Sequence, residues 1–213
     1  MKNNKKARTA SEKLHSKDKG YKLASNLDFF IFIAGLLVAL FTVRAFIFEP
    51  VRVDGESMQN TLQNDERCVV EKVSYWFTKP KAGDIVIVHY PDRGNDSFVK
   101  RVVATGGQTI ELVGELARGA DGKPLFKILV DGVPLDESAY EPNMLIESAV
   151  FSPWSITGQG EGGYTVPEGY VFVMGDHRTN SHDSRRVGPI PLSSVVGRVH
   201  GVLYPFNRMR SVD

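Results

Sequence analysis

The chain has too few cysteines for a covalent or metal-based framework. Its 213 residues include one cysteine, Cys68, so an intrachain disulfide is impossible. Structural zinc needs several Cys or His ligands at short spacing, and the five histidines lack that spacing. The sequence therefore predicts a fold that depends on its hydrophobic core, with no metal and no cofactor. Cys68 is expected to be a buried apolar side chain in a strand.

The chain also lacks a strong net charge. Its formal charge is +1, which is not typical of a nucleic-acid-binding protein, so no nucleic-acid partner is expected. The charge is unevenly distributed, however. Residues 1–26 contain eight Lys or Arg and two acidic residues, so the rest of the chain carries a net charge of −5. We interpret 1–26 as a disordered, basic cytoplasmic tail.

The chain has one long apolar run and lacks a second. The fifteen residues from Phe29 to Val43 fall short of the roughly 20 needed to cross a bilayer. The run continues beyond Arg44, whose side chain can reach the interface along its own methylenes, and 27–48 then spans 22 residues. This pattern predicts a single transmembrane helix at 27–48. The basic residues before it predict a cytoplasmic N-terminus and an extracytoplasmic region 49–213.

A cleaved secretory signal peptide is the alternative interpretation of the apolar run. Such a peptide ends in a cleavage site of small residues. No small-x-small pattern follows Val43, because Ala45 is succeeded by Phe, Ile and Phe. The polar region before the run is also long, so a retained anchor is the favoured prediction.

The region after the apolar run has the pattern of a mainly β fold. Alternating or clustered apolar residues next to turn signals predict strands at 51–54, 68–73, 84–90, 98–104, 127–130, 170–174 and 195–204. Gly197 and Gly201 are expected to be bulges or bends in the last strand. Helical signals are weak and limited to short segments near Thr61 and at 191–196. The stretch 111–166 is rich in Gly and turn dipeptides, which predicts an inserted, loop-rich β lobe.

Four short blocks hold the residues that could carry chemistry. Singly they are weak signals, since a serine in a Gly-containing loop is usually a turn residue and a lysine between valines usually faces solvent. The last block is stronger, because its eleven residues include two Asp, two Arg, two Ser and one Asn. The blocks are Ser57-Met58-x-x-Thr61-Leu62, Gly83-Asp84-Ile85-Val86, Val99-Lys100-Arg101-Val102-Val103 and the segment from Gly175 to Arg185.

The order of these four blocks after an apolar run resembles bacterial type I signal peptidase, also called leader peptidase. The resemblance extends from the apolar run to about Tyr204 and includes Gly197-Arg198-Val199. It implies that Ser57 is the nucleophile and Lys100 the general base of a Ser/Lys-dyad serine protease. It also implies that 49–213 is an all-β catalytic domain.

The chemistry of such a dyad depends on a neutral lysine. A serine hydroxyl becomes a good nucleophile when an adjacent base takes its proton. A free lysine is protonated at neutral pH, but burial in apolar surroundings lowers its pKa. In a strand, Phe98, Lys100 and Val102 share one face, so the two apolar neighbours would supply that desolvation.

The resemblance assigns supporting roles to five further residues. It implies that Arg101 pairs with Asp176, that Ser181 hydrogen-bonds to Lys100, and that Asp183 and Arg185 brace the loop. A sixth residue, Met58, would line the substrate pocket.

The Ser57 backbone N–H would be one donor to the oxyanion. Some family members place a serine hydroxyl two positions before the nucleophile, where this chain has Gly55. The chain also has Asn60 where the family has proline, and 105–108 reads Thr-Gly-Gly-Gln instead of Leu-Pro-Gly-Asp. These departures concern loop rigidity and the second oxyanion donor.

The leading hypothesis is a membrane-bound serine endopeptidase that removes signal peptides after small residues in an Ala-x-Ala pattern. Its partners would be membrane lipid and secretory preproteins emerging from the translocation machinery. Its location would be the bacterial plasma membrane, with the catalytic domain on the outer face. Three alternatives remain: a Ser-His-Asp site that uses His177 or His182 with Asp183, a self-cleaving repressor-type Ser/Lys protease, and a tethered β domain without enzymatic activity.

Overall fold

The computed structural model describes residues 27–44, 48–90, 93–94, 96–118, 122, 124–140, 146–147 and 163–212. The chain divides into two compact units, Met1–Phe46 and Ile47–Asp213. The basic tail predicted at 1–26 lies outside the described residues.

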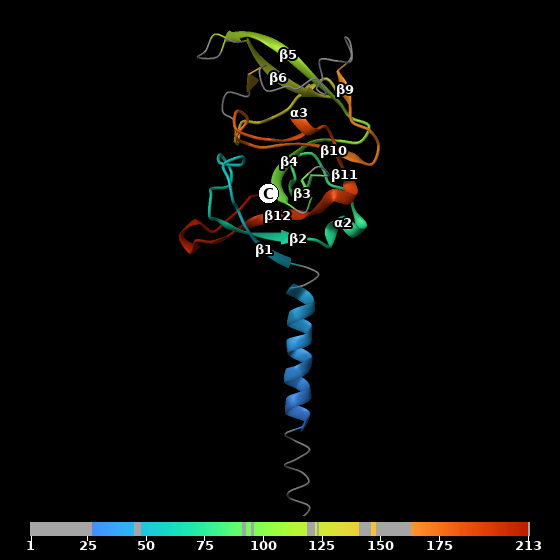
Figure 1. The fold of residues 1–213 in the computed structure, drawn as a ribbon, viewed down its shortest axis with the longest axis vertical. Coiled ribbons are helices and arrows are strands. Elements are labelled where there is room, and N and C mark those ends of the chain that lie inside the picture. Colours follow the sequence, from blue (N-terminus) through green and yellow to red (C-terminus); the bar gives the residue numbers. More distant parts are fainter. Residues whose placement is uncertain are drawn as a thin grey trace, which may run out of the picture. The chain divides into compact units, whose positions relative to one another are not determined.

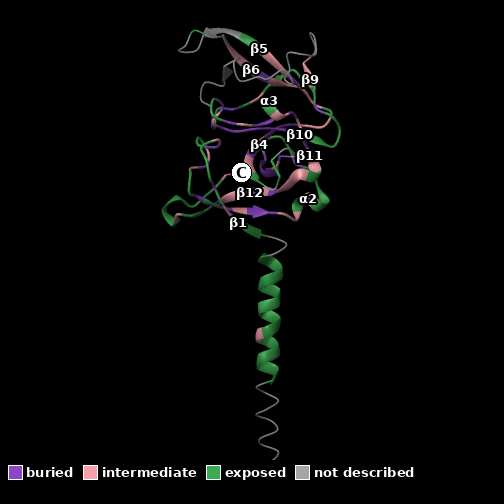
Figure 2. Cartoon of the chain, in the orientation of Figure 1, coloured by how far each residue is buried: buried purple, intermediate pink, exposed green. Residues whose placement is uncertain are grey.

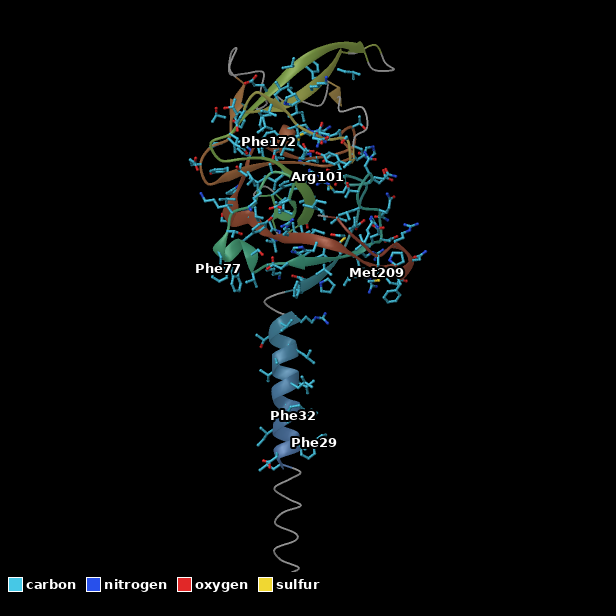
Figure 3. All side chains as sticks on the ribbon, turned by 180° about the vertical axis from the view of Figure 1, so that it is seen from behind. Phe29, Phe32, Phe77, Arg101, Phe172 and Met209 are labelled. Atoms are coloured by element: carbon cyan, nitrogen blue, oxygen red, sulfur yellow. The ribbon has the colours of Figure 1, made fainter. Side chains whose placement is uncertain are left out.

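The first unit contains one helix over residues 27–42, followed by a π-helical turn at 43–44. Its large apolar side chains, such as Phe29 and Phe32, are exposed (Figures 2 and 3). None of the helices in the described ranges is both long enough and apolar enough to cross a membrane. The predicted end of this segment at residue 48 is wrong, because Phe48 pairs with Glu71 in a β ladder. Pro50 follows closely, and the residue before a proline disfavours helical geometry.

The second unit is mainly β, as predicted, and its larger sheet is antiparallel throughout. In the described residues this sheet has eight strands in the order β1-β2-β12-β3-β4-β10-β11, with β13 paired to β12. Its strands are β1 Phe48–Arg52, β2 Arg67–Glu71, β3 Ile85–His89, β4 Ser97–Thr105, β10 Tyr170–Met174, β11 Ile190–Pro191, β12 Val195–Tyr204 and β13 Arg210–Ser211. The order places β4, which carries Lys100, between β3 and β10.

A smaller five-stranded sheet lies at the end of this domain away from β1 and β2 (Figure 1). Its strands are β5 Thr109–Arg118, β6 Pro124–Val130, β7 Val133–Pro134, β8 Ile146–Glu147 and β9 Tyr164–Thr165. We call the segment 109–165 the small-sheet lobe. It falls on the predicted insertion 111–166, but the expectation of a loop-rich segment missed the ten-residue strand β5. The sequence of β5 contains two glutamates and a glycine, residues that are depleted in strands.

The helices of the domain are short. They are α2 Ser74–Phe77, α3 Ser184–Val187 and the 3₁₀ turns η5 Leu192–Ser194 and η6 Phe206–Arg208. The predicted helical segment at 191–196 contains η5, whereas Thr61 lies in a turn and the helix expected there is wrong. The Asp183 side chain caps α3 by accepting a hydrogen bond from the Arg185 backbone N–H.

Three apolar clusters form the core of the domain (Figure 2). The first packs β1, β2, β3 and β12 against Met58 and Leu62 of the loop between β1 and β2. The second joins β4 and β10 to the small sheet, and the third covers the other face of β3, β4 and β10. Cys68 is in the first cluster, and burial raises the pKa of its thiol to about 11. The prediction of a buried Cys68 is confirmed.

Gly197 and Gly201 interrupt the regular pairing of β12, as predicted. The register of β12 shifts between Val195 and Gly197 against β3, and between Val199 and Gly201 against β2. A Cβ atom on Gly197 would lie 2.4 Å from the carbonyl oxygen of Glu71. No side chain fits at that separation without moving the backbone of β2.

We therefore expect Gly197→Ala to destabilise the protein by about 2 kcal/mol, because overpacking against a rigid strand forces a backbone shift. Gly114→Ala in β5 is the matched control, since its Cβ would lie 3.6 Å from the nearest atom, a normal contact. Equilibrium unfolding in urea measures both variants. Equal stability of the two would contradict the packing explanation.

Candidate active site

The loop between β1 and β2 holds Ser57 in place, because residues that follow Ser57 in this loop are buried in the core. Met58 is 1% exposed and Leu62 is fully buried. The Met58 carbonyl accepts hydrogen bonds from the N–H groups of Thr61 and Leu62, which closes a tight turn directly after Ser57. Gly55 has a φ of +110°, a conformation that residues with a side chain rarely adopt. The loop therefore turns sharply before Ser57 and is anchored directly after it.

Lys100 approaches Ser57 from the interior of β4. Its Nζ atom is hydrogen-bonded to Ser57 Oγ at 2.6 Å, and the residue is 2% exposed. Phe98 and Val102, two positions before and after Lys100, belong to the third apolar cluster or pack against it. The amine lies 6.0 Å from the centre of the Phe98 ring. The arrangement brings a hydroxyl and a buried amine into direct contact.

The pKa of Lys100 is lowered from 10.5 to about 8, mainly because burial disfavours the charged form. The carboxylates of Asp183 and Asp176 act in the opposite direction, and the Arg185 guanidinium adds to the lowering. The lysine is thus closer to a neutral base near physiological pH than an exposed lysine would be.

Arg101, the next residue on β4, makes a two-pronged ion pair with Asp176. Arg101 Nε lies 2.9 Å from Asp176 Oδ1, and Nη2 lies 2.7 Å from Oδ2. Arg101 Nη1 also donates to the Gly83 carbonyl at 2.9 Å. Figure 3 shows Arg101 near the middle of the domain, whereas Phe77 and Met209 lie at its surface. The pair connects β4 to the loop that follows β10.

Asp183 and Arg185 form a second, fully buried ion pair within that loop. Arg185 Nε and Nη2 each donate to the carboxylate at 2.8 Å. Asp183 Oδ2 also accepts the Gly175 N–H at 2.9 Å, and Arg185 Nη1 donates to the Arg178 carbonyl at 2.7 Å. Burial alone would raise the pKa of Asp183, but the hydrogen bonds and charge of Arg185 hold it below its ordinary value. The carboxyl therefore stays ionised and fixes the loop.

The loop after β10 also packs directly on the nucleophile. The His177 N–H donates to the Ser57 carbonyl at 3.0 Å. A Cβ on Gly175 would lie 2.4 Å from that carbonyl oxygen and 2.3 Å from Ser181 Oγ. Ser181 is buried, and its hydroxyl helps to lower the pKa of Asp183. Ser181 Oγ has no well-formed hydrogen bond with the described residues, so the predicted bond to Lys100 is not found in this structure.

Two residues without a predicted role connect these parts. Thr61 Oγ1 donates a short hydrogen bond to Asp176 Oδ2, which ties the nucleophile loop to the loop after β10. Arg210 of β13 donates to the Thr61 carbonyl at 2.6 Å and to both oxygens of the buried Glu66 at 2.8 Å. Thr61 belongs to the same sequence block as Ser57. Arg210 lies 144 residues from Glu66 and had no local signal.

The dyad opens into a cavity of about 360 Å³. One wall comes from the end of β1 and the loop after it, and the other from the start of β4. Its lining includes Ser57, Lys100, Met58 and several apolar side chains, namely Val51, Val53, Phe98 and Val99. Arg52, Asp54, Asp96 and Ser97 also line the cavity, so its surface is partly polar and partly apolar.

The described contacts differ from a Ser-His-Asp arrangement. The ring of His177 contacts the Glu56 carbonyl at 3.1 Å, and Asp183 is engaged by Arg185 and Gly175. Within the described ranges, no three His, Cys, Asp or Glu side chains are grouped so that they could hold a metal ion.

A serine in contact with a buried amine, at the mouth of a cavity, defines a serine hydrolase type of site. The comparisons with known proteins agree with this class. The family model described as "Signal peptidase, peptidase S26" matches residues 26–204, so the chain belongs to the signal peptidase family S26. The chain is accordingly a hydrolase, a serine peptidase.

Individual relatives cover most of the chain. A probable signal peptidase I-1 of Synechocystis sp. is 36% identical over 81% of this chain and 79% of its own length. A signal peptidase I of Bacillus licheniformis is 36% identical over 86% of this chain and 90% of its own. The crystal structure of a signal peptidase I from Enterococcus faecalis V583 is 26% identical, covers 57% of this chain and 97% of that chain, and superimposes with a TM-score of 0.39.

We expect Lys100→Met to stabilise the protein at about pH 7 by up to about 3 kcal/mol, the free energy that corresponds to the lowered pKa of Lys100. Because the folded-state pKa lies below the unfolded-state value, the unfolded chain binds more protons between about pH 8 and about pH 10.5. Wild-type stability therefore rises with pH through this window, and the advantage of the variant shrinks. Urea unfolding at the two ends of the window measures this. If wild type and Lys100→Met differed by the same free energy of unfolding at both pH values, Lys100 would not be desolvated.

Proposed function

We propose that the chain is a membrane-bound serine endopeptidase that cleaves N-terminal signal peptides from exported preproteins, with Ser57 as nucleophile and neutral Lys100 as general base. The hydrogen bond of 2.6 Å between Lys100 Nζ and Ser57 Oγ is the observation that carries this proposal. Membership of the signal peptidase family supports the substrate class.

The proposed reaction follows from the positions of these two groups. Neutral Lys100 accepts the Ser57 proton while Oγ attacks the carbonyl carbon of the scissile bond. When the tetrahedral intermediate collapses, the C–N bond breaks and Lys100 returns the proton to the leaving amine. A water molecule then attacks the Ser57 ester, and Lys100 accepts its proton. When this second intermediate collapses, the C–O bond to Ser57 breaks and Lys100 returns the proton to Oγ, which releases the acid product and restores Ser57 and neutral Lys100.

The intermediate needs donors for its oxyanion. The Ser57 N–H is one candidate. Gly55 offers no hydroxyl, although a Cβ there would meet open space. We therefore propose that the second donor is a backbone N–H or a water molecule.

The edge of β4 beside the cavity supports an extended binding mode for the substrate. β10 pairs with β4 from Thr105 to Arg101, and no described strand pairs with 97–100 on that side. An extended substrate could lie along this free edge and direct alternate side chains into the cavity. We propose the Ala-x-Ala pattern for the residues before the scissile bond, and membership of the signal peptidase family supports it.

We further propose that the enzyme works at the outer face of the bacterial plasma membrane, on preproteins leaving the translocation machinery. The support is the basic composition of 1–26 followed by the apolar run from Phe29 to Val43, which favours a cytoplasmic N-terminus and contact with membrane lipid.

Ser57→Ala and Lys100→Ala are each expected to lower cleavage of a synthetic preprotein by on the order of a thousandfold or more, because each removes one half of the dyad. Ser138→Ala and Lys79→Ala, at exposed positions, are the matched controls and should cleave normally. An acylating probe should label Ser57 in the wild type. Full activity of Lys100→Ala would exclude the dyad, and absence of both cleavage and labelling would favour a non-enzymatic domain.

The pH dependence of kcat/KM gives an independent measurement. We expect kcat/KM to rise with pH around the lowered pKa of Lys100, about 8, and to be constant at higher pH. We call the rising part of this profile the limb; it arises because only the neutral amine acts as base. A limb at the ordinary lysine pKa would show that burial does not activate Lys100.

A further inference from the structure

The small-sheet lobe contributes two buried side chains from a segment outside its strands. In the segment 135–140, between β7 and β8, Glu137 is 1% exposed and Tyr140 is 8% exposed. Their neighbours Asp136, Ser138 and Ala139 are exposed. A hydrogen bond from the Tyr140 N–H to the Glu137 carbonyl closes the turn and directs both side chains inward.

Both side chains contact Arg178, which belongs to the loop after β10. Glu137 Oε1 lies 2.5 Å from Arg178 Nη1, and both side chains are 1% exposed. Arg178 Nη2 donates to the Tyr140 hydroxyl at 3.3 Å. The Tyr140 ring lies 4.3 Å from the Arg101 guanidinium carbon and 5.3 Å from that of Arg178. The aromatic ring thus contacts two cations, and Glu137 neutralises one of them.

These contacts lead to Lys100 by two routes. Along the first, the Arg178 carbonyl accepts a hydrogen bond from Arg185, which pairs with Asp183. Along the second, Tyr140 packs on Arg101, which pairs with Asp176.

The charged groups that act on Lys100 are Asp183, Arg185 and Asp176, and all three lie on the loop after β10 or in α3. Lys100 also hydrogen-bonds to Ser57. The lobe segment 135–140 therefore supports both ion pairs that surround the general base.

A purely stabilising role is a poor explanation for the Glu137–Arg178 pair. Removing two charges from water costs several kcal/mol for each, and a buried ion pair is often no more stabilising than apolar residues of the same size. Its geometric effect is larger, because a buried carboxylate restricts the guanidinium to one position. This points to a role in holding the loop.

We propose that Glu137 and Tyr140 are positioning residues of the active site, which hold the loop 176–185 through Arg178 so that Lys100 remains shielded from water beside Ser57. The proposal rests on the proposed Ser/Lys peptidase function. It assigns the small-sheet lobe a part in setting the basicity of the general base.

The test is the pH profile of Glu137→Gln with a synthetic Ala-x-Ala peptide. A loosened loop admits water to Lys100 and raises its pKa, so kcat/KM at about pH 7 should fall about tenfold for each unit by which the limb moves up. If the limb moves up by one unit, the loss should shrink to within about threefold at about pH 9.5, where most of the Lys100 amine is neutral in both proteins. The loss should be in kcat rather than KM. Burial raises the pKa of Tyr140 to about 12, so this residue stays neutral over that range.

Asp136→Asn is the matched control, because it removes the same charge from the adjacent, exposed residue. Its profile should match the wild type. Tyr140→Phe keeps the ring against both guanidiniums and should retain the wild-type limb, whereas Tyr140→Ala should move the limb upward. Thermal unfolding shows whether Glu137→Gln folds. If it does not, the two Tyr140 variants still test the proposal.

A folded Glu137→Gln whose activity is unchanged, or is reduced by the same factor at every pH, would overturn the positioning role. If Glu137→Gln does not fold, the positioning role would be overturned when kcat/KM of Tyr140→Phe and of Tyr140→Ala rises with pH over the same range. Failure of the proposed function is distinguishable, because then the wild type itself would not cleave the peptide, or Ser57→Ala would cleave it.

Discussion

The burial of the Lys100 amine next to Ser57 is the constraint on which the rest of the domain depends. An ammonium group inside apolar surroundings loses its hydration, and this loss lowers the pKa of Lys100 to about 8. The fold must keep water away from the amine and also hold it within 2.6 Å of the hydroxyl. The first requirement depends on the apolar face of β4, and the second on Met58, which fixes the nucleophile loop in the core.

The carboxylates near Lys100 are neutralised, which is consistent with that constraint. An unpaired carboxylate would raise the pKa of the lysine and favour its inactive, charged form. Asp176 pairs with Arg101, and Asp183 pairs with Arg185. The Arg101–Asp176 pair also joins segments that are distant in the chain, so the same contact controls charge and geometry.

Much of the sheet could be predicted because its central strands have a strong apolar pattern. The strands predicted at 84–90, 98–104, 170–174 and 195–204 agree closely with β3, β4, β10 and β12. The pattern failed where it was ambiguous. Phe48 continues an apolar run and was placed in a helix, but its pairing with Glu71 makes it a strand residue. β5 was missed because glutamate and glycine weaken its pattern, whereas pairing with β6 stabilises it.

The sequence by itself determined the order of the elements, the mainly β class and the identity of Ser57 and Lys100 as the candidate reacting pair. The first two follow from local apolar periodicity, and the reacting pair is what the resemblance of the four ordered blocks to the signal peptidase family implies. Only the tertiary structure decided which groups meet: Thr61 with Asp176, Arg210 with Glu66, and Glu137 with Arg178. Such contacts depend on strand pairing and on the removal of water from the interior. Both arise only when distant segments pack together, so no local pattern reports them.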